Sequence, residues 1–188
     1  MRTWAIPVGL SLALFVVFAV FFKTIILTPT ILSDFGPHID FARKACEGTG
    51  LWPRHVLFFA LVALTSFWST SLLVWQTSAW MWLAFFVAAK FLASVWFGRL
   101  WVKRSQVSQG REAGWIIAGA LGLTVVFCFP QPAAYALDLW YAYSFPPNTW
   151  HNSTQIAVMP IAIIVFGLSA LQLDDPGNVR RAVAIAMF

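Results

Sequence analysis

The side chains best suited to chemistry gather in one short stretch, residues 34–55, between two long apolar runs. It contains three of the seven acidic residues and two of the three histidines: Asp34, Asp40, Glu47, His38 and His55. Ionisable groups beside a hydrocarbon phase are costly to maintain unless they bind a partner or a substrate. The pattern indicates either a functional site at the edge of a membrane or a solvated loop, and composition leaves both interpretations open.

The composition indicates a membrane protein. The mean hydropathy is +0.77, and only 10% of the residues are charged, whereas about a quarter are charged in a soluble domain. At about 20 residues per spanning helix, the 188 residues accommodate five or six helices with short loops. We therefore expect an all-α helical bundle in a lipid bilayer, with residues 1–188 forming a single transmembrane domain.

The charges and cysteines argue against several other classes of protein. The net charge of +5 lies in short clusters beside the apolar runs, which favours a role in membrane orientation over a nucleic-acid surface. Cys46 and Cys128 have neither CxxC spacing nor histidines at metal-site spacing, so we expect no metal site and no disulfide framework. Haem or metal binding by His38, His55 and His151 is a weaker alternative, because their spacing matches no known ligand pattern. We expect no cofactor.

The apolar runs predict the helices and their order. Five spans are expected at residues 4–28, 55–75, 79–102, 113–129 and 155–173, with a break at Gln76-Thr-Ser. Between the first two, residues 39–45 predict a short amphipathic helix in the membrane interface, capped by Ser33 or Asp34 and ended by Gly48 or Gly50. Residues 182–188 are too few to span a bilayer. We therefore expect them to start a sixth helix, in the N-terminal part of a larger protein.

The positive-inside rule gives a topology that separates the two polar loops. The basic cluster at residues 99–111 predicts a cytoplasmic loop, and residues 131–154, which contain no lysine or arginine, predict an external one. Counting spans then places residues 29–54 in the cytoplasm. The two polar loops share a face only if one intervening run is re-entrant or interfacial. The run that carries Lys90 is our candidate, since an intramembrane lysine favours a buried partner.

Two stretches resemble the membrane glycosyltransferases of the GT-C superfamily, over roughly residues 5–173. The first is Asp34-x-x-x-His38-x-Asp40-Phe-Ala-Arg43, followed by Gly-x-Gly and Pro53-Arg54-His55, similar to the first external loop of that family. The second is Trp150-His151-Asn152-Ser-Thr154, similar to a turn that starts a later helix. It departs from the family pattern at Ser153, where proline is usual.

The resemblance implies transfer of a sugar from a polyprenyl-phosphate donor to an acceptor outside the cytoplasm, by an integral protein of the bacterial inner membrane. It implies an aspartate as catalytic base, with Asp34 as first choice and Asp40 as second. Desolvation beside the membrane would raise the pKa of such a carboxyl towards the range needed for a base. The expected substrate-binding residues are His38, Arg43, Lys44, Arg54, His55, Trp150, His151 and Asn152, with Trp140 or Trp150 stacking on a sugar ring.

Each of these residues also has a structural interpretation. Asp34 is suited to cap a helix, Asp40 and Arg43 to form an i,i+3 ion pair, and His151 with Asn152 to cap the last helix. The rival function is a non-enzymatic membrane scaffold or a transporter fragment, although no pair of interrupted helices in matching halves supports a transporter. The transferase hypothesis requires residues 29–54 and 131–154 to share the non-cytoplasmic face, which charge counting disputes.

Overall fold

The computed structural model describes residues 4–27, 35–51, 56–104, 111–127 and 153–187. Across these ranges the chain forms seven helices and no strand, which confirms the expected all-α class. The helices are α1 (Ala5–Leu27), α2 (Phe35–Cys46), α3 (Val56–Ser66), α4 (Leu72–Arg104), α5 (Arg111–Phe127), α9 (Ser153–Asp174) and α10 (Val179–Ala186).

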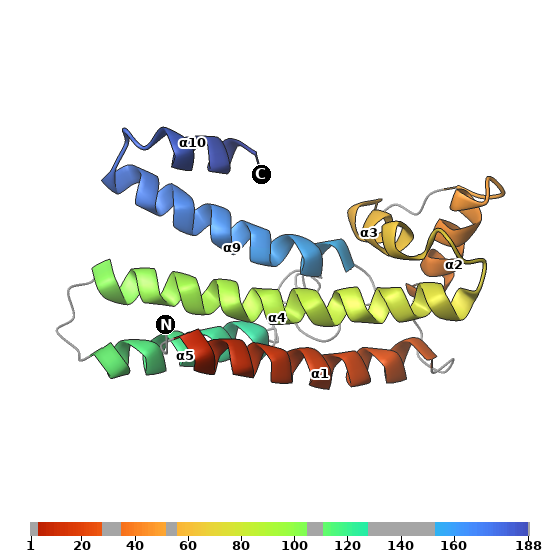
Figure 1. The fold of residues 1–188 in the computed structure, drawn as a ribbon, viewed down its shortest axis with the longest axis horizontal. Helices are drawn as coiled ribbons and strands as arrows, with labels where there is room; N and C mark the ends of the chain where they lie inside the picture. The colour runs from red at the N-terminus through yellow and green to blue at the C-terminus, as the bar shows by residue number, and fades with distance from the viewer. Residues whose placement is uncertain (1–3, 28–34, 52–55, 105–110, 128–152, 188) are drawn as a thin grey trace, which may run out of the picture.

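The long helix α4 is the centre of the bundle. Helices α1 and α5 pack along one side of it and α9 packs along the other (Figure 1). Helices α2 and α3 gather at the end where α4 begins, and α10 folds back along α9 (Figure 1). The polar stretch after α1 is therefore held at one end of the bundle.

Three helices in the described ranges, α1, α4 and α9, are long and apolar enough to cross a membrane. Helices α3 and α5 are apolar but shorter, so the expectation of about five spans is not confirmed. The 11 residues of α3 extend about 16 Å, roughly half of the 30 Å hydrocarbon core. The chain is an integral membrane protein by the length and composition of its helices.

The break between the second and third expected spans lies elsewhere than predicted. Gln76-Thr-Ser is not a loop, because α4 already begins at Leu72 and continues through it. Within the helix, the hydroxyl of Thr77 donates to the main-chain oxygen of Leu73 at 2.7 Å, which satisfies this polar group without leaving the helix. The chain instead turns at residues 67–71, where the Ser69 hydroxyl accepts a hydrogen bond from the Ser71 amide at 3.2 Å.

This change also alters the expected topology. The run with Lys90, our candidate for a re-entrant segment, lies inside the longest helix that could span a membrane. An unbroken helix of 33 residues is not a re-entrant hairpin, so the re-entrant form of that prediction is wrong. The interfacial form stays a prediction, and α3 is the short element. Helix α9 begins beside α3 and contacts it, so α2 and the first turns of α9 lie towards the same end of α4 (Figure 1). Residues 128–152 lie outside the described residues, and the shared non-cytoplasmic face stays a prediction.

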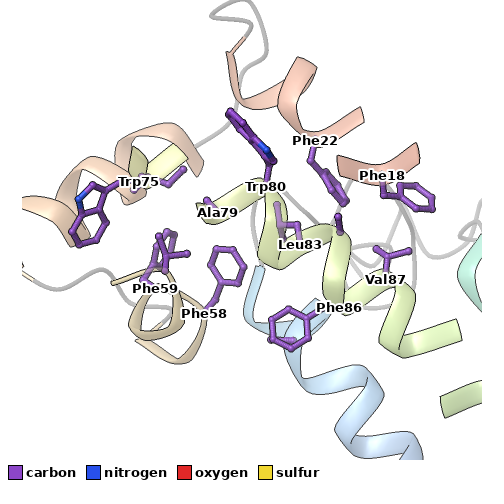
Figure 2. Packing of buried hydrophobic residues seen from close by; sticks show 14 of the residues in the cluster. Phe18, Phe22, Phe58, Phe59, Trp75, Ala79, Trp80, Leu83, Phe86 and Val87 are labelled. Carbon is purple, nitrogen blue, oxygen red and sulfur yellow. The ribbon is translucent and has the colours of Figure 1, made fainter. Parts of the chain in front are cut away.

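The core is a cluster of aromatic and small side chains around the first half of α4 (Figure 2). Leu83 of α4 and Phe22 of α1 are fully buried, as are Phe58 and Phe59 of α3. Further along, α4 and α5 approach closely, because a Cβ atom at Gly122 would lie 2.8 Å from Cγ2 of Val95. In a membrane, where lipid is as apolar as leucine, this kind of close packing stabilises helix pairs.

Two arginines fix the far end of α9. Arg104, the last residue of α4, donates to the main-chain oxygen of Ala170 and, through Nε at 2.8 Å, to Asp174. Arg181 of α10 donates to the main-chain oxygen of Leu171. Both bonds reach carbonyl groups near the end of α9. They join the ends of α4, α9 and α10, and α10 occupies the region where we expected a sixth helix to start.

Candidate functional site

The charged side chains of the polar stretch lie on one face of α2. Asp40, Arg43 and Lys44 of α2 and Glu47, directly after its last residue, are here called the α2 cluster. They are spaced i, i+3, i+4 and i+7 and therefore lie on the same side. The opposite face carries Ile39 and Ala42, both fully buried. The helix ends with the amide of Thr49 donating to the oxygen of Lys44 at 2.9 Å, across Gly48 at a positive φ of 73°. The short amphipathic helix and its glycine stop are confirmed.

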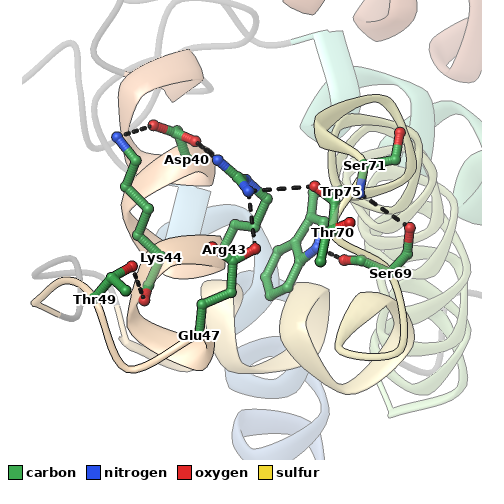
Figure 3. A network of polar contacts seen from close by, with 9 residues as sticks. All are labelled: Asp40, Arg43, Lys44, Glu47, Thr49, Ser69, Thr70, Ser71 and Trp75. Atoms are coloured by element: carbon green, nitrogen blue, oxygen red, sulfur yellow. Dashed lines mark hydrogen bonds and ion pairs between the residues drawn. The ribbon is translucent and has the colours of Figure 1, made fainter.

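Arg43 is the centre of the α2 cluster (Figure 3). Its Nη2 and Nε donate to Oδ1 of Asp40 at 2.7 and 3.2 Å. Its Nη1 donates to Oε1 of Glu47 at 2.8 Å and to the main-chain oxygen of Thr70 at 3.2 Å. These bonds engage four of the five N–H donors of a guanidinium. Arg43 therefore attaches α2 to the turn before α4. Only one N–H donor of its guanidinium remains for a substrate.

Asp40 is held between two cations. Its Oδ2 lies 2.8 Å from Nζ of Lys44, while its Oδ1 accepts from Arg43. Hydrogen bonds from Lys44 and then from Arg43 hold the pKa of Asp40 below its ordinary value, against a smaller opposing effect of burial. The expected rise in pKa is therefore wrong for this carboxyl. An ionised, doubly paired carboxylate is a poor proton acceptor, so Asp40 is better suited to position Lys44 and Arg43.

Lys44 is the most accessible cation of the α2 cluster. Its side chain is 46% exposed, against 19% for Arg43. An ammonium group has three N–H donors, and in the described part of the chain its only ion-pair partner is Asp40. Lys44 is thus the member of the cluster best placed to contact an anion from outside.

His38 lies where α2 meets α3. Its ring is 5.9 Å from the ring of Phe59, edge to face, and 6.1 Å from that of Phe41. These contacts place the imidazole among aromatic side chains. Within the described ranges, no group of three or more histidine, cysteine, aspartate or glutamate residues is arranged to hold a metal ion.

Several predicted residues cannot be placed against this cluster. Asp34, Arg54, His55, Trp140, Trp150, His151 and Asn152 lie outside the described residues. Of the predicted site, the structure brings together Asp40, Arg43 and Lys44 on one face, with His38 against α3. Contact between the two stretches that carry the family resemblance stays a prediction.

The turn between α3 and α4 is the part of the site that sequence reasoning missed. The indole Nε1 of the buried Trp75 donates to the main-chain oxygen of Ser69 at 2.7 Å, and Arg43 binds the oxygen of the next residue, Thr70 (Figure 3). The hydroxyl-rich residues 69–71 lie inside residues 55–75, which the sequence predicts to be a single span. The clustering of serine and threonine was the available signal for a turn.

An apolar groove adjoins this turn. It has a volume of about 680 Å³ and lies between α1, the end of α3 and the first half of α4. Its lining residues are Phe15, Thr65, Trp68, Leu73, Val74, Thr77, Ser78, Met81, Trp82 and Phe85. We call it the α4 groove. Thr70, which binds Arg43, lies between two of its lining residues in the sequence, so the α2 cluster and the groove share one end of the bundle.

The hydroxyl groups of the α4 groove are satisfied within the protein. Thr65 Oγ1 accepts from Nε1 of Trp82 at 3.1 Å and contacts the hydroxyl of Ser78. Thr77 binds a carbonyl of its own helix. The groove therefore presents hydrocarbon and aromatic rings, a surface that accommodates an alkyl or isoprenoid chain better than a sugar.

The fold and the site define an all-helical integral membrane protein with a charged amphipathic helix beside an apolar groove. Comparisons with protein-family models, with curated proteins and with solved structures find no match to this chain.

Proposed function

We propose that this protein is a membrane glycosyltransferase of the GT-C type, which transfers a sugar from a polyprenyl-phosphate donor to an acceptor outside the cytoplasm of a bacterial cell. The observation that carries the proposal is the position of the α2 cluster beside the α4 groove. A polyprenyl phosphate has an anionic head and a long hydrocarbon tail, and this arrangement offers a cationic group and an apolar surface at one end of the bundle.

Lys44 binds the donor phosphate in this proposal. Its side chain is nearly half exposed, and charge-assisted hydrogen bonds to phosphate are about twice as strong as neutral ones. Asp40 holds Lys44 from the other side at 2.8 Å. Arg43 keeps α2 in place through Thr70 and contributes positive charge, with few donors left for direct contact.

The isoprenoid chain lies in the α4 groove. The lining residues on α4 extend from Leu73 to Phe85, a length of about 18 Å along the helix. A hydrocarbon chain buried against Trp82 and Phe85 needs no polar partner. The hydroxyl groups of the groove already have hydrogen-bond partners within the protein and need none from the ligand. The same surface is open to lipid, from which a membrane-bound donor would enter.

The catalytic base in this proposal is Asp34, which directly precedes α2 in the sequence. It accepts the proton of the acceptor hydroxyl as that oxygen bonds to the anomeric carbon and the bond to the lipid phosphate breaks. Asp40 is not the base, because its lone pairs are occupied by Lys44 and Arg43 and its pKa is lowered.

A transfer assay in nanodiscs with a sugar-loaded polyprenyl phosphate tests the proposal. Asp34→Asn should keep the helical content and remove transfer, because asparagine caps a helix about as well as aspartate and an amide cannot accept the proton. Lys44→Gln should raise the KM for the donor and leave kcat nearly unchanged. Full transfer by Asp34→Asn would reject Asp34 as the base.

One observation favours the rival function, a non-enzymatic membrane scaffold. All four hydrogen bonds of Arg43 are internal, as expected if the α2 cluster only secures α2 to the bundle. A scaffold would bind no donor. Retention of a photoreactive polyprenyl phosphate no higher than in empty nanodiscs, for both the protein and Lys44→Gln, together with no transfer to any acceptor, would support the scaffold.

A further inference from the structure

An arginine at the other end of the bundle stacks on a tryptophan ring. Arg99 lies near the end of α4, about 40 Å along the helix from Leu72. Its guanidinium stacks on the ring of Trp115 in α5, with Cζ 4.4 Å from the ring centroid. Among the side chains that the structure describes, no carboxylate forms an ion pair with it. The absence of a side chain at Gly114 makes room for the guanidinium, because a Cβ there would collide with Nη1.

This stacked arginine adjoins a second apolar groove. The ring of Trp115 packs edge to face against that of Trp4, with the centroids 4.9 Å apart. Trp4 lines a groove of about 710 Å³ between α1, α4 and α9, and so does Trp96, which lies one helical turn before Arg99. We call it the α1–α9 groove. The cationic Arg99 is thus separated from the hydrocarbon lining of the α1–α9 groove by only one or two side chains.

The lining of the α1–α9 groove selects for hydrocarbon. Its one hydroxyl, on Ser11, donates to the main-chain oxygen of Ala88 at 3.2 Å and is satisfied. The other lining residues are apolar or aromatic, among them Leu12, Phe85 and Ile164. An occupant of this groove needs a flexible apolar chain and no polar group along it.

We propose that the α1–α9 groove binds an anionic phospholipid, with one acyl chain in the groove and the phosphate on Arg99. The planar guanidinium offers two parallel N–H groups that match phosphate oxygens, while one of its faces stays on Trp115. Lys103 adds positive charge at the same end. The positive-inside rule places this basic end in the cytoplasmic leaflet, which carries the anionic lipids. The phosphate site at Arg99 lies at the opposite end of α4 from the α2 cluster, although the two grooves share Phe15 and Phe85 in their linings. Binding of a phospholipid there does not depend on the proposed transferase activity.

Native mass spectrometry of the purified full chain, with phosphatidylglycerol or phosphatidylcholine added, measures this binding directly. We expect retention of phosphatidylglycerol over phosphatidylcholine. Arg99→Gln should weaken the binding of phosphatidylglycerol about tenfold, as expected for loss of a charge-assisted pair of hydrogen bonds. Lys103→Gln is the matched control, since it removes one exposed charge at the same end, and it should change the affinity less than twofold.

A variant that fills the groove distinguishes the contribution of the acyl chain to lipid binding from that of the headgroup. Ala89 is half-buried and lines the groove, so Ala89→Phe should weaken lipid binding with no change of charge, while circular dichroism reports intact helices. Equal binding of the two lipids would overturn the proposal, as would equal losses in Arg99→Gln and Lys103→Gln. Thermal protection by inorganic phosphate alone, or a dimer mass that replaces the lipid adduct, would also overturn it.

Discussion

Replacement of Trp75 by phenylalanine tests whether one buried indole fixes the turn on which the α2 cluster depends. Trp75 is only 1% exposed, and its Nε1 donates to the oxygen of Ser69 at 2.7 Å, directly before the carbonyl that Arg43 binds. Trp75→Phe keeps an aromatic ring in the core but removes the donor. Loss of a donor from a part-buried carbonyl costs about 1–3 kcal/mol, so we expect the free energy of unfolding to fall by about that amount.

Trp68→Phe is the matched control for this change. Its Nε1 makes the same kind of bond, to the oxygen of Thr65 at 3.0 Å, but its side chain is 68% exposed. At the surface the carbonyl of Thr65 has other hydrogen-bond partners, so we expect the free energy of unfolding to fall by less than about 0.5 kcal/mol. Unfolding in mixed micelles with increasing SDS measures both variants. Equal losses for the two, or no loss for Trp75→Phe, would refute the role of Trp75 in the turn.

Further predictions follow from the packing, the ion pairs and the topology. Gly122→Leu should destabilise the α4–α5 pair by about 1–3 kcal/mol through overpacking. Gly119→Leu should not, because a Cβ atom at Gly119 would meet nothing within 4 Å. Equal effects of the two variants in SDS titration would contradict this. The lowered folded-state pKa of Asp40 means that the unfolded chain binds its proton more tightly. Its stabilisation is therefore complete above about pH 4 and is lost as the pH falls through the lower folded-state value, and Asp40→Asn should remove this part of the acid dependence of unfolding. In a cysteine-free background, an impermeant thiol reagent on intact cells should label cysteines placed at Ser144 and at Thr49; labelling only the first would reject a shared external face.

Most of the fold could be predicted from local sequence. Hydropathy alone identifies the apolar helices, because a chain in lipid must satisfy its backbone within each helix. The observed limits of α1 and α9 lie within about two residues of those predicted. The spacing of Asp40, Arg43 and Lys44 also placed them on one face of a short helix, since i,i+3 and i,i+4 neighbours on a helix meet whatever surrounds it.

Only the tertiary structure decided where the chain turns and which side chains contact residues distant in the sequence. A sequence such as Gln76-Thr-Ser is compatible with a loop or with a helix, because a threonine hydroxyl can bind a carbonyl of its own helix, as that of Thr77 does. The sign of the pKa shift of Asp40 depends on paired cations that a one-dimensional pattern cannot weigh against burial. The bond from Arg43 to Thr70 joins residues 27 positions apart. Contacts of this kind depend on how helices pack, which hydropathy does not encode, because it describes each segment's affinity for lipid and not for its neighbours.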